Sequence, residues 1–159
     1  MSGQGKSGAT AFSVRRLGAG EESVLADLNA LFAREFDDAE AYASSPPRTD
    51  YLASLLRDEC FVALVAMDGE RLIGGLVAYG LRKFEQERTE IYIYDLAVVS
   101  QRRREGIATG LIEALKPIAR GLGAWVIFVQ ADHGDEPAIA LYEGIGVRED
   151  VLHFDIPVS

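Results

Sequence analysis

The sequence predicts a single mixed α/β domain, and three observations support this prediction. The chain has 159 residues, of which 48% are hydrophobic, so it is long and apolar enough to bury one sizeable core. Stretches of alternating apolar residues, typical of strands, are interspersed with stretches of helical periodicity. No internal repeat and no linker rich in Pro, Gly and Ser follows residues 1–11, which are expected to form a disordered leader. We therefore expect residues 12–159 to form one domain.

The N-terminal half is expected to supply one strand, two helices and a hairpin. Residues 12–17 alternate like a first strand, and residues 18–36 place apolar side chains at helical spacing with acids in the first turn. After a break at the string SSPPRT, residues 49–58 restart a short helix. Two β-rich runs within residues 61–84 flank an Asp-Gly turn dipeptide, which indicates a hairpin.

The C-terminal half is expected to supply three further strands separated by two helices. The apolar run at residues 90–99 is too continuous for a half-exposed strand, so we expect it in the centre of the sheet. A helix over 106–122, a buried strand over 124–131 and a short helix over 135–146 follow. Residues 151–158 alternate like a last strand. The expected element order is β-α-α-β-β-β-α-β-α-β, a mixed sheet flanked by helices.

Composition narrows the class of partner and the compartment. The net charge of -9 argues against nucleic acid, which requires a basic face, and it favours a cationic partner. No apolar run approaches the roughly 20 residues that span a bilayer, so no membrane is expected. The single cysteine, Cys60, excludes an internal disulfide and fits a reducing compartment, so we expect a cytoplasmic protein. The two histidines lack metal-ligand spacing, so no metal is expected.

Three consecutive arginines, at 102–104, are unusual in an acidic chain because neighbouring cations repel each other. They lie between a strand and a helix, where free backbone N–H groups and the helix dipole favour an anion. Gly106 and Ala108 would let a ligand approach the main chain closely. The pattern alone allows a phosphate-binding loop or a solvated basic turn. It lacks the G-x-x-x-x-G-K-[ST] and G-x-G-x-x-G patterns, so ATP and NAD are poor candidates.

The string RREGIA at residues 103–108 resembles the (Gln/Arg)-x-x-Gly-x-(Gly/Ala) signature of the GCN5-related N-acetyltransferases, the GNAT superfamily. The expected element order is similar to that of the superfamily over about residues 12–157. The strings EIYIYDLAV, VQAD and HFDI resemble the aminoglycoside 3-N-acetyltransferases of type I. The resemblance implies the GNAT fold, with a mixed central sheet of about six or seven strands that is splayed at the central strand.

The resemblance also implies acetyl-CoA as the cosubstrate. Its pyrophosphate would lie on the backbone N–H groups of the arginine-rich loop, and its pantetheine arm would bond the main chain of the preceding strand. A main-chain N–H of that strand would polarise the acetyl carbonyl. The expected contacts are Leu96, Ala97 and Val98 for the arm, and Arg103, Arg104, Glu105, Gly106, Ile107, Ala108 and Thr109 for the pyrophosphate.

An acetyl acceptor must present a neutral amine, so a group that accepts a proton is needed. Asp95 is the best candidate because it interrupts an otherwise apolar strand; the alternative is a structural salt bridge to an arginine of the protein. Tyr94, a candidate substrate contact, would point to the opposite face unless a bulge re-aims the strand. The resemblance implies that Tyr142 protonates the leaving thiolate, whereas the alternative is a core aromatic.

Acidic residues near the C-terminus could hold the ammonium groups of a polycationic sugar, or they could be caps and solvated charges. These residues are Asp132, Asp135, Glu136 and Asp155. The leading hypothesis is direct transfer of acetyl from acetyl-CoA to the 3-amino group of an aminoglycoside, by a homodimeric enzyme. One alternative is acetylation of another small polyamine or metabolite amine. Another is a non-catalytic module that binds acyl-CoA.

Overall fold

The computed structural model describes residues 11–159, so the leader expected over 1–11 lies outside the described residues except for Ala11. The chain divides into two compact units, the first ending at Val129 and the second running from Gln130 to Ser159. None of the helices in the described part of the chain has the length and apolar character needed to cross a bilayer.

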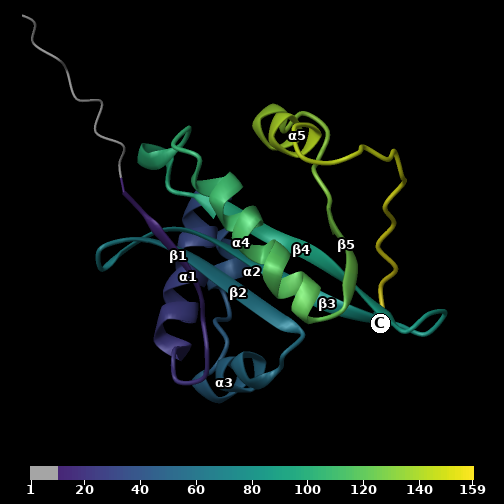
Figure 1. The fold of residues 1–159 in the computed structure, drawn as a ribbon. Coiled ribbons are helices and arrows are strands. Elements are labelled where there is room, and N and C mark those ends of the chain that lie inside the picture. The colour runs from purple at the N-terminus through teal and green to yellow at the C-terminus, as the bar shows by residue number, and fades with distance from the viewer. Residues whose placement is uncertain (1–10) are drawn as a thin grey trace, which may run out of the picture. The chain divides into compact units, whose positions relative to one another are not determined.

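A five-stranded mixed sheet forms the centre of the first unit, with strand order β1-β2-β3-β4-β5 (Figure 1). Neighbouring strands are antiparallel except β4 and β5, which are parallel. The strands are β1 (Ser13–Arg16), β2 (Phe61–Asp68), β3 (Arg71–Lys83), β4 (Arg88–Val98) and β5 (Ala124–Val129). The central position expected for the apolar run at 90–99 is confirmed, because β4 pairs with strands on both sides.

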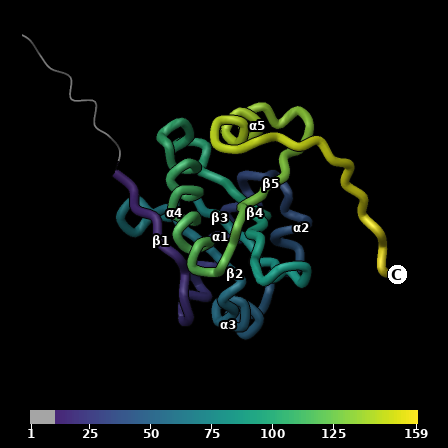
Figure 2. The backbone as a smooth tube through the Cα atoms, turned by 45° about the vertical axis from the view of Figure 1, so that its right-hand side comes forward, coloured from purple at the N-terminus to yellow at the C-terminus, as the bar shows by residue number. Residues whose placement is uncertain are grey.

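Helices cover both faces of this sheet, with α4 in front and α1 behind in Figure 1. Figure 2 shows the chain leaving β4 and passing through a short turn directly into α4. One helix, α2, was not expected from the sequence; the carboxylate of Asp38 caps it by accepting the N–H of Ala41 at 3.0 Å. The helical elements are α1 (Glu22–Glu35), α2 (Ala39–Ala43), α3 (Thr49–Arg57), the 3-10 turn η1 (Ser100–Arg102) and α4 (Ile107–Gly121).

The hydrophobic core lies between the sheet and these helices. Leu28 and Leu31 of α1 and Leu111 and Leu115 of α4 are fully buried, as their helical spacing predicts. Helix α1 approaches β3 so closely that a Cβ at Gly75 would lie 2.3 Å from a methyl carbon of Leu28. A glycine at this point of β3 therefore allows α1 to pack directly on the strand.

A β-bulge and an early end of pairing set apart the second half of β4. Val77 of β3 pairs with Asp95, and the next β3 residue pairs with Ile93, so Tyr94 is the extra residue of a bulge. Pairing between β4 and β5 ends at Ile93 and Val129. Residues 94–98 consequently have a strand partner only on the β3 side within the first unit, which confirms the expected splay at the central strand.

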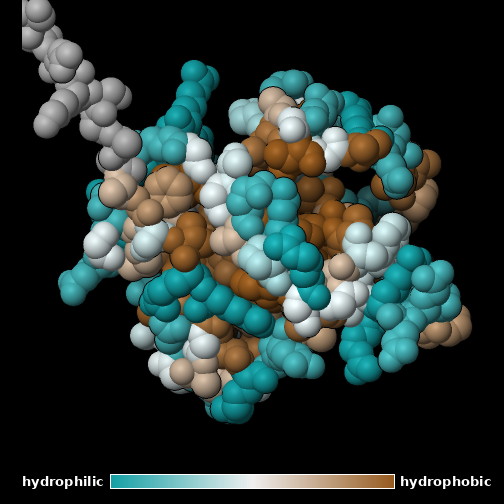
Figure 3. Space-filling view, in the orientation of Figure 1, coloured by the Kyte–Doolittle hydropathy of each residue, from teal (hydrophilic) through white to brown (hydrophobic). Residues whose placement is uncertain are grey.

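The second unit contains one helix, α5 (Glu136–Glu143), capped by the carboxylate of Asp135, which accepts the N–H of Ala138 at 3.3 Å. The prediction of a last strand over 151–158 is wrong: residues 144–159 contain no helix or strand. The described sheet therefore has five strands rather than six or seven. Apolar alternation makes a strand only where another backbone supplies hydrogen bonds, and here side chains such as Phe154 are 77% exposed. Figure 3 shows that hydrophobic residues also reach the surface on the face drawn there.

Candidate active site

Asp95 lies at the bulge of β4, and its side chain lines a pocket of ≈ 180 Å³ within the first unit. Helices α1 and α3 and strands β2 and β3 supply most of the remaining wall, which is apolar and aromatic. Asp95 is the one charged residue among the described residues that line this pocket. The polar and aromatic residues beside it are Asn29, Phe32, Tyr42, Tyr51, Phe61 and Tyr79. The pocket thus presents a single carboxylate on a largely apolar surface.

The hydroxyl of Tyr42, on α2, donates a short hydrogen bond to Oδ1 of Asp95. Within residues 11–159 no arginine or lysine forms an ion pair with Asp95, so the structural salt bridge considered as an alternative is absent from the described chain. Burial raises the pKa of the Asp95 carboxyl, and the hydrogen bond from Tyr42 opposes this rise without cancelling it. A half-buried carboxylate with a raised pKa is suited to accept a proton from an amine.

Tyr42 was not predicted from the sequence. It lies 53 residues before Asp95, on a helix of five residues that carries no apolar periodicity of its own. Burial, and then the Asp95 carboxylate, raise the pKa of Tyr42, so its hydroxyl stays protonated and acts as a donor. No local pattern in the sequence signals this contact, because it depends on how α2 packs against α1.

Tyr94 lies beside the pocket rather than inside it. Its side chain is 63% exposed, and its ring contacts those of Tyr79, at 6.0 Å between centroids, and Tyr92, at 5.4 Å. Tyr79 lines the same pocket as Asp95. Neighbouring residues of a regular strand point to opposite faces of the sheet, so Tyr94 and Asp95 would normally lie on different sides. The bulge changes this and places Tyr94 beside Tyr79, a ring that lines the Asp95 pocket.

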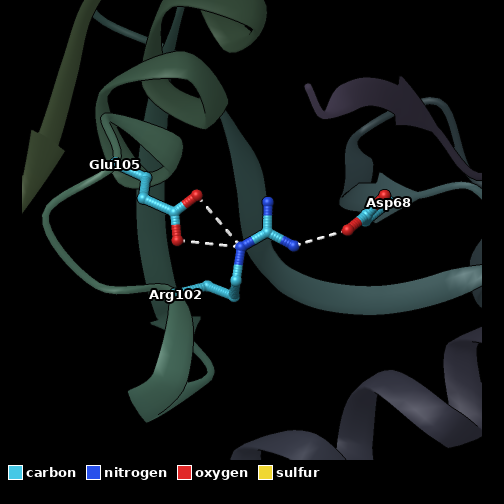
Figure 4. A network of polar contacts seen from close by, with 3 residues as sticks. All are labelled: Asp68, Arg102 and Glu105. Carbon is cyan, nitrogen blue, oxygen red and sulfur yellow. Dashed lines mark hydrogen bonds and ion pairs between the residues drawn. The ribbon is translucent and has the colours of Figure 1, made fainter. Parts of the chain in front are cut away.

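Arg102, the first of the three consecutive arginines, is a structural residue. It is 8% exposed; its Nε donates to both carboxylate oxygens of Glu105, at 3.0 and 2.8 Å, and Nη1 donates to Asp68 at 2.6 Å (Figure 4). Glu105 and then Asp68 raise the pKa of this guanidinium, which therefore stays charged. The network ties the β2–β3 turn to the loop before α4. Nη2 of Arg102 is buried and has no hydrogen-bond partner among residues 11–159.

The other two arginines differ from each other. Arg103 donates to Glu35, at the end of α1, at 3.3 Å, and the same Glu35 oxygen accepts from the hydroxyl of Ser100 at 2.9 Å. Arg104 is exposed and forms no ion pair with any residue that the structure describes. Its φ of 64° and the φ of 80° at Gly106 both lie in the left-handed region, which glycine adopts without strain.

The start of α4 fits an anion. Gly106 caps the helix without a side-chain hydrogen bond, and a Cβ at that position would meet no atom within 4 Å. No side chain therefore caps the first N–H groups of α4. Arg102, five residues before the helix, also keeps an Nη2 group without a hydrogen-bond partner among the described residues. Ile107 buries its side chain in the core, so only its main chain could contact a ligand. These observations are compatible with the pyrophosphate of acetyl-CoA.

The second half of β4 fits an extended ligand. The side chains of Leu96, Ala97 and Val98 are half-buried, and their main-chain groups on the side away from β3 have no strand partner in the first unit. A ligand with amide groups, such as a pantetheine arm, could use those groups as another strand would. Asp95 directly precedes this open segment.

The remaining predicted site residues lie in the second unit, and their roles stay predictions. Burial, and then the Asp135 carboxylate, raise the pKa of Tyr142 on α5. Asp135 is the cap of α5, and Asp155 contacts the ring of His153 at 2.9 Å. Asp132 and Glu136 are exposed. Across residues 11–159 no group of three or more His, Cys, Asp or Glu side chains is placed to hold a metal ion.

The chain is similar to two solved structures over nearly its whole length. The aminoglycoside acetyltransferase HMB0005 from an uncultured soil metagenomic sample shares 53% identity and a TM-score of 0.91, covering 94% of this chain and 99% of that one. The aminoglycoside acetyltransferase meta-AAC0020, also from an uncultured soil metagenomic sample, was crystallised with sisomicin; it shares 30% identity and a TM-score of 0.86, covering 93% of this chain and 97% of that one.

Curated relatives match a shorter region. N-acetyltransferase 8B of Rattus norvegicus is 29% identical over 105 residues, which are 66% of this chain and 47% of that protein, so the chain spans about half the length of that relative. The acetyltransferase (GNAT) family matches residues 25–147, a range that includes the Asp95 pocket, the open half of β4 and the loop before α4. The protein therefore belongs to the acetyltransferase (GNAT) family, as the string at residues 103–108 predicted.

Proposed function

We propose that this protein transfers acetyl from acetyl-CoA to the 3-amino group of an aminoglycoside. One observation carries the proposal: a carboxylate with a raised pKa and no cationic partner lines a pocket at the point where β4 opens. A half-buried carboxylate without a cationic partner is costly to the fold, which favours a cation that arrives with the substrate. The aminoglycoside acetyltransferases that resemble this chain support this class of acceptor.

Acetyl-CoA supplies an activated thioester carbonyl. The main chain of Leu96, Ala97 and Val98 would hold its pantetheine arm, and the backbone from Arg103 to Thr109 would hold its pyrophosphate. One of the strand N–H groups would donate to the acetyl oxygen, where negative charge develops. Ion pairs made by Arg102, Arg103 and Glu105 would fix the conformation of this loop, so these side chains would support CoA binding without contacting the cofactor.

Asp95 would act on the acceptor. Its carboxylate attracts the substrate ammonium and accepts one of its protons, and the neutral nitrogen then attacks the acetyl carbon. The bond between nitrogen and the acetyl carbon forms, the bond to sulfur breaks, and the nitrogen releases its surplus proton to solvent as the neutral amide forms. The thiolate takes a proton, for which Tyr142 is the proposed donor, and Tyr142 regains its proton from solvent. No covalent enzyme intermediate is needed, and Cys60 is not among the residues that line the pocket.

The position of acetylation and the assembly rest on the sequence. The 3-amino position follows from the strings that resemble the type I 3-N-acetyltransferases, and Tyr94, Asp132, Asp135, Glu136 and Asp155 are the proposed substrate contacts. The cytoplasmic location, inferred from the single cysteine, and the homodimer also stay predictions.

A second candidate is the same chemistry on a small amine of lower charge. The pocket presents one carboxylate among apolar and aromatic side chains, whereas a polycation would be matched by several acids. This composition suits a single amino group carried on a body that can pack against Tyr51, Phe61 and Tyr79.

A thiol-release assay with acetyl-CoA distinguishes these functions. The purified chain is given a panel of aminoglycosides and of simple mono- and diamines, with Asp95→Asn as the control. We expect turnover with gentamicin-like aminoglycosides and a product that carries acetyl on the 3-amino group by NMR. A product acetylated on the 6'-amino group would reject the proposed 3-amino position but not the proposed acetylation of aminoglycosides. Turnover only with simple amines would favour the second candidate, and CoA binding without turnover of any amine would indicate a non-catalytic module.

A further inference from the structure

Tyr42 is the residue that directly contacts the proposed proton acceptor. Its hydroxyl donates to Oδ1 of Asp95, and no other side chain in the described chain hydrogen-bonds that carboxylate. Oδ2 is therefore left for another donor. An amine that entered the pocket could bond Oδ2 without displacing Tyr42.

The rest of Tyr42 is held in place by α1. Asn29 donates from its side-chain amide to the main-chain carbonyl of Tyr42 at 2.6 Å. The Tyr42 ring packs against Phe36, with centroids 5.5 Å apart, and against Phe32, at 6.2 Å. Two ring contacts and a hydrogen bond to the main-chain carbonyl leave the Tyr42 hydroxyl little freedom. The contact with Asp95 is thus supported by a packed second layer of side chains.

The groups that face Asp95 offer no other source of compensation for its charge. The polar or titratable residues that line the pocket with Asp95 are Asn29 on α1, Tyr42 on α2, Tyr51 on α3 and Tyr79 on β3. Asp38, the cap of α2, and Tyr94 on β4 act electrostatically on Tyr42. None of these residues is a cation. The hydroxyl of Tyr42 is therefore the group that stabilises the ionised form of Asp95, in opposition to the cost of burial.

We propose that Tyr42 is a positioning residue for acetyl transfer: it orients the Asp95 carboxylate through one oxygen, leaves the other oxygen for the acceptor amine, and keeps the carboxylate ionised before the amine arrives. The inference rests on the proposed function, in which Asp95 accepts the proton. It adds a residue from a five-residue helix that no sequence pattern assigns to the site.

The direction of the expected effect follows from the hydrogen bond. Because the bond favours the ionised form, its removal raises the pKa of Asp95 further. The proton-accepting form is then lost at a higher pH. Hydrogen bonds to charged groups change such equilibria by roughly one to two pH units when they are well shielded, so about one unit is expected for this half-buried pair.

The test compares Tyr42→Phe with the wild-type chain in kcat/KM across pH, using acetyl-CoA and the best amine from the panel. We expect the acidic limb to move upward by about one pH unit, with activity below that limb reduced about tenfold and the plateau reduced less than threefold. Tyr51→Phe is the matched control, since it removes a hydroxyl from the same pocket without a bond to Asp95; whatever it does to KM, its acidic limb should stay in place.

A second variant and a direct measurement separate the possible failures. Asn29→Ala loosens the main chain of Tyr42 and should move the limb in the same direction by a smaller amount. A carbon NMR titration of the Asp95 carboxylate in the free protein reads the same shift without turnover. A uniform loss of activity at every pH in Tyr42→Phe, or an unchanged Asp95 titration, overturns the inference. If the wild type acetylates no amine, the proposed function fails, whatever the titration shows.

Discussion

The half-buried carboxylate of Asp95 and the buried guanidinium of Arg102 differ in how the protein compensates their charges. Arg102 lies between two carboxylates, Glu105 and Asp68, which accept three hydrogen bonds from its guanidinium. Asp95 accepts one hydrogen bond, from the neutral hydroxyl of Tyr42, and forms no ion pair with a cation in the part of the chain that the structure describes. The fold thus compensates the charge of Arg102 internally, whereas the charge of Asp95 is left for a partner from outside.

This difference separates residues that hold the fold from residues that are available for chemistry. A compensated ion pair is costly to break, because removal of one partner leaves the other buried and unpaired. An uncompensated buried carboxylate destabilises the fold on its own account, so its removal should not harm stability. The same contrast divides the three consecutive arginines: Arg102 and Arg103 are engaged within the protein, and Arg104 is open to solvent.

The largest expected effect is that of Asp95→Asn on turnover. The change keeps the shape and removes the proton-accepting group, so kcat/KM should fall by at least about 10². The pKa of Asp95 is raised in the folded chain, so stability falls as the pH rises from the unfolded-state pKa through the folded-state pKa, and the full cost is present above both. The melting temperature of the variant at neutral pH should therefore hold or rise.

Steady-state kinetics and calorimetric melting decide this prediction, with CoA affinity as the control that should change little. Near-normal turnover would show that Asp95 is not the proton acceptor. A large loss of stability would place Asp95 among the residues that hold the fold, and the contrast with Arg102 would disappear.

The opposite pattern is expected at Arg102. Arg102→Met retains much of the side-chain volume but leaves Glu105 and Asp68 without their shared cation, so Tm should fall by about 5 °C or more. Arg104→Met is the matched control, since Arg104 has no ion pair in the described chain, and its Tm should stay within about 1 °C of the wild type. Equal melting temperatures for the two variants would contradict the distinction between them.

A smaller effect is expected on CoA affinity when the two outer arginines are compared. Arg104→Ala should weaken CoA binding by about threefold to tenfold, because its charge is free to contact phosphate. Arg103→Ala should weaken CoA binding less than Arg104→Ala does, because Glu35 already forms an ion pair with the Arg103 guanidinium. Arg103→Ala should nevertheless weaken CoA binding more than it weakens acceptor binding. Isothermal titration at two salt concentrations measures both, and the loss in Arg104→Ala should shrink at high salt. No loss in either variant would refute the phosphate-binding loop.

The smallest effect is a displacement of the pH profile of the wild type. Because burial raises the pKa of Asp95, the acidic limb of kcat/KM should lie above the ordinary range of an aspartate, which is about 4. Activity should be full above that limb and lost as the pH falls through it. A limb near pH 4 would mean that the substrate-free pocket does not perturb the carboxylate.

Several features of the fold and site are determined by local sequence. Apolar periodicity identifies the strands from β1 to β5 and the helices α1, α3, α4 and α5, because such an element repeats its burial pattern over a few residues, but it does not identify α2. The RREGIA string identifies the loop and the family, because a helix start that approaches an anion needs a glycine at one particular place. Asp95 is conspicuous in the sequence because a charge inside an apolar strand is expensive.

Only the tertiary structure decides which partner each of these charged side chains meets. Tyr42 pairs with Asp95 from 53 positions away, Asp68 with Arg102 from 34 and Glu35 with Arg103 from 68, and no local pattern encodes the packing of these elements. Glu105, the other partner of Arg102, lies only three positions away. The bulge at Tyr94 depends on the register of β3 against β4, and residues 151–158 alternate as a strand does but have no strand partner in the described chain. Periodicity reports which face of an element is apolar; the position of each element in space, and therefore whether a charge is compensated, follows from contacts between segments far apart in the chain.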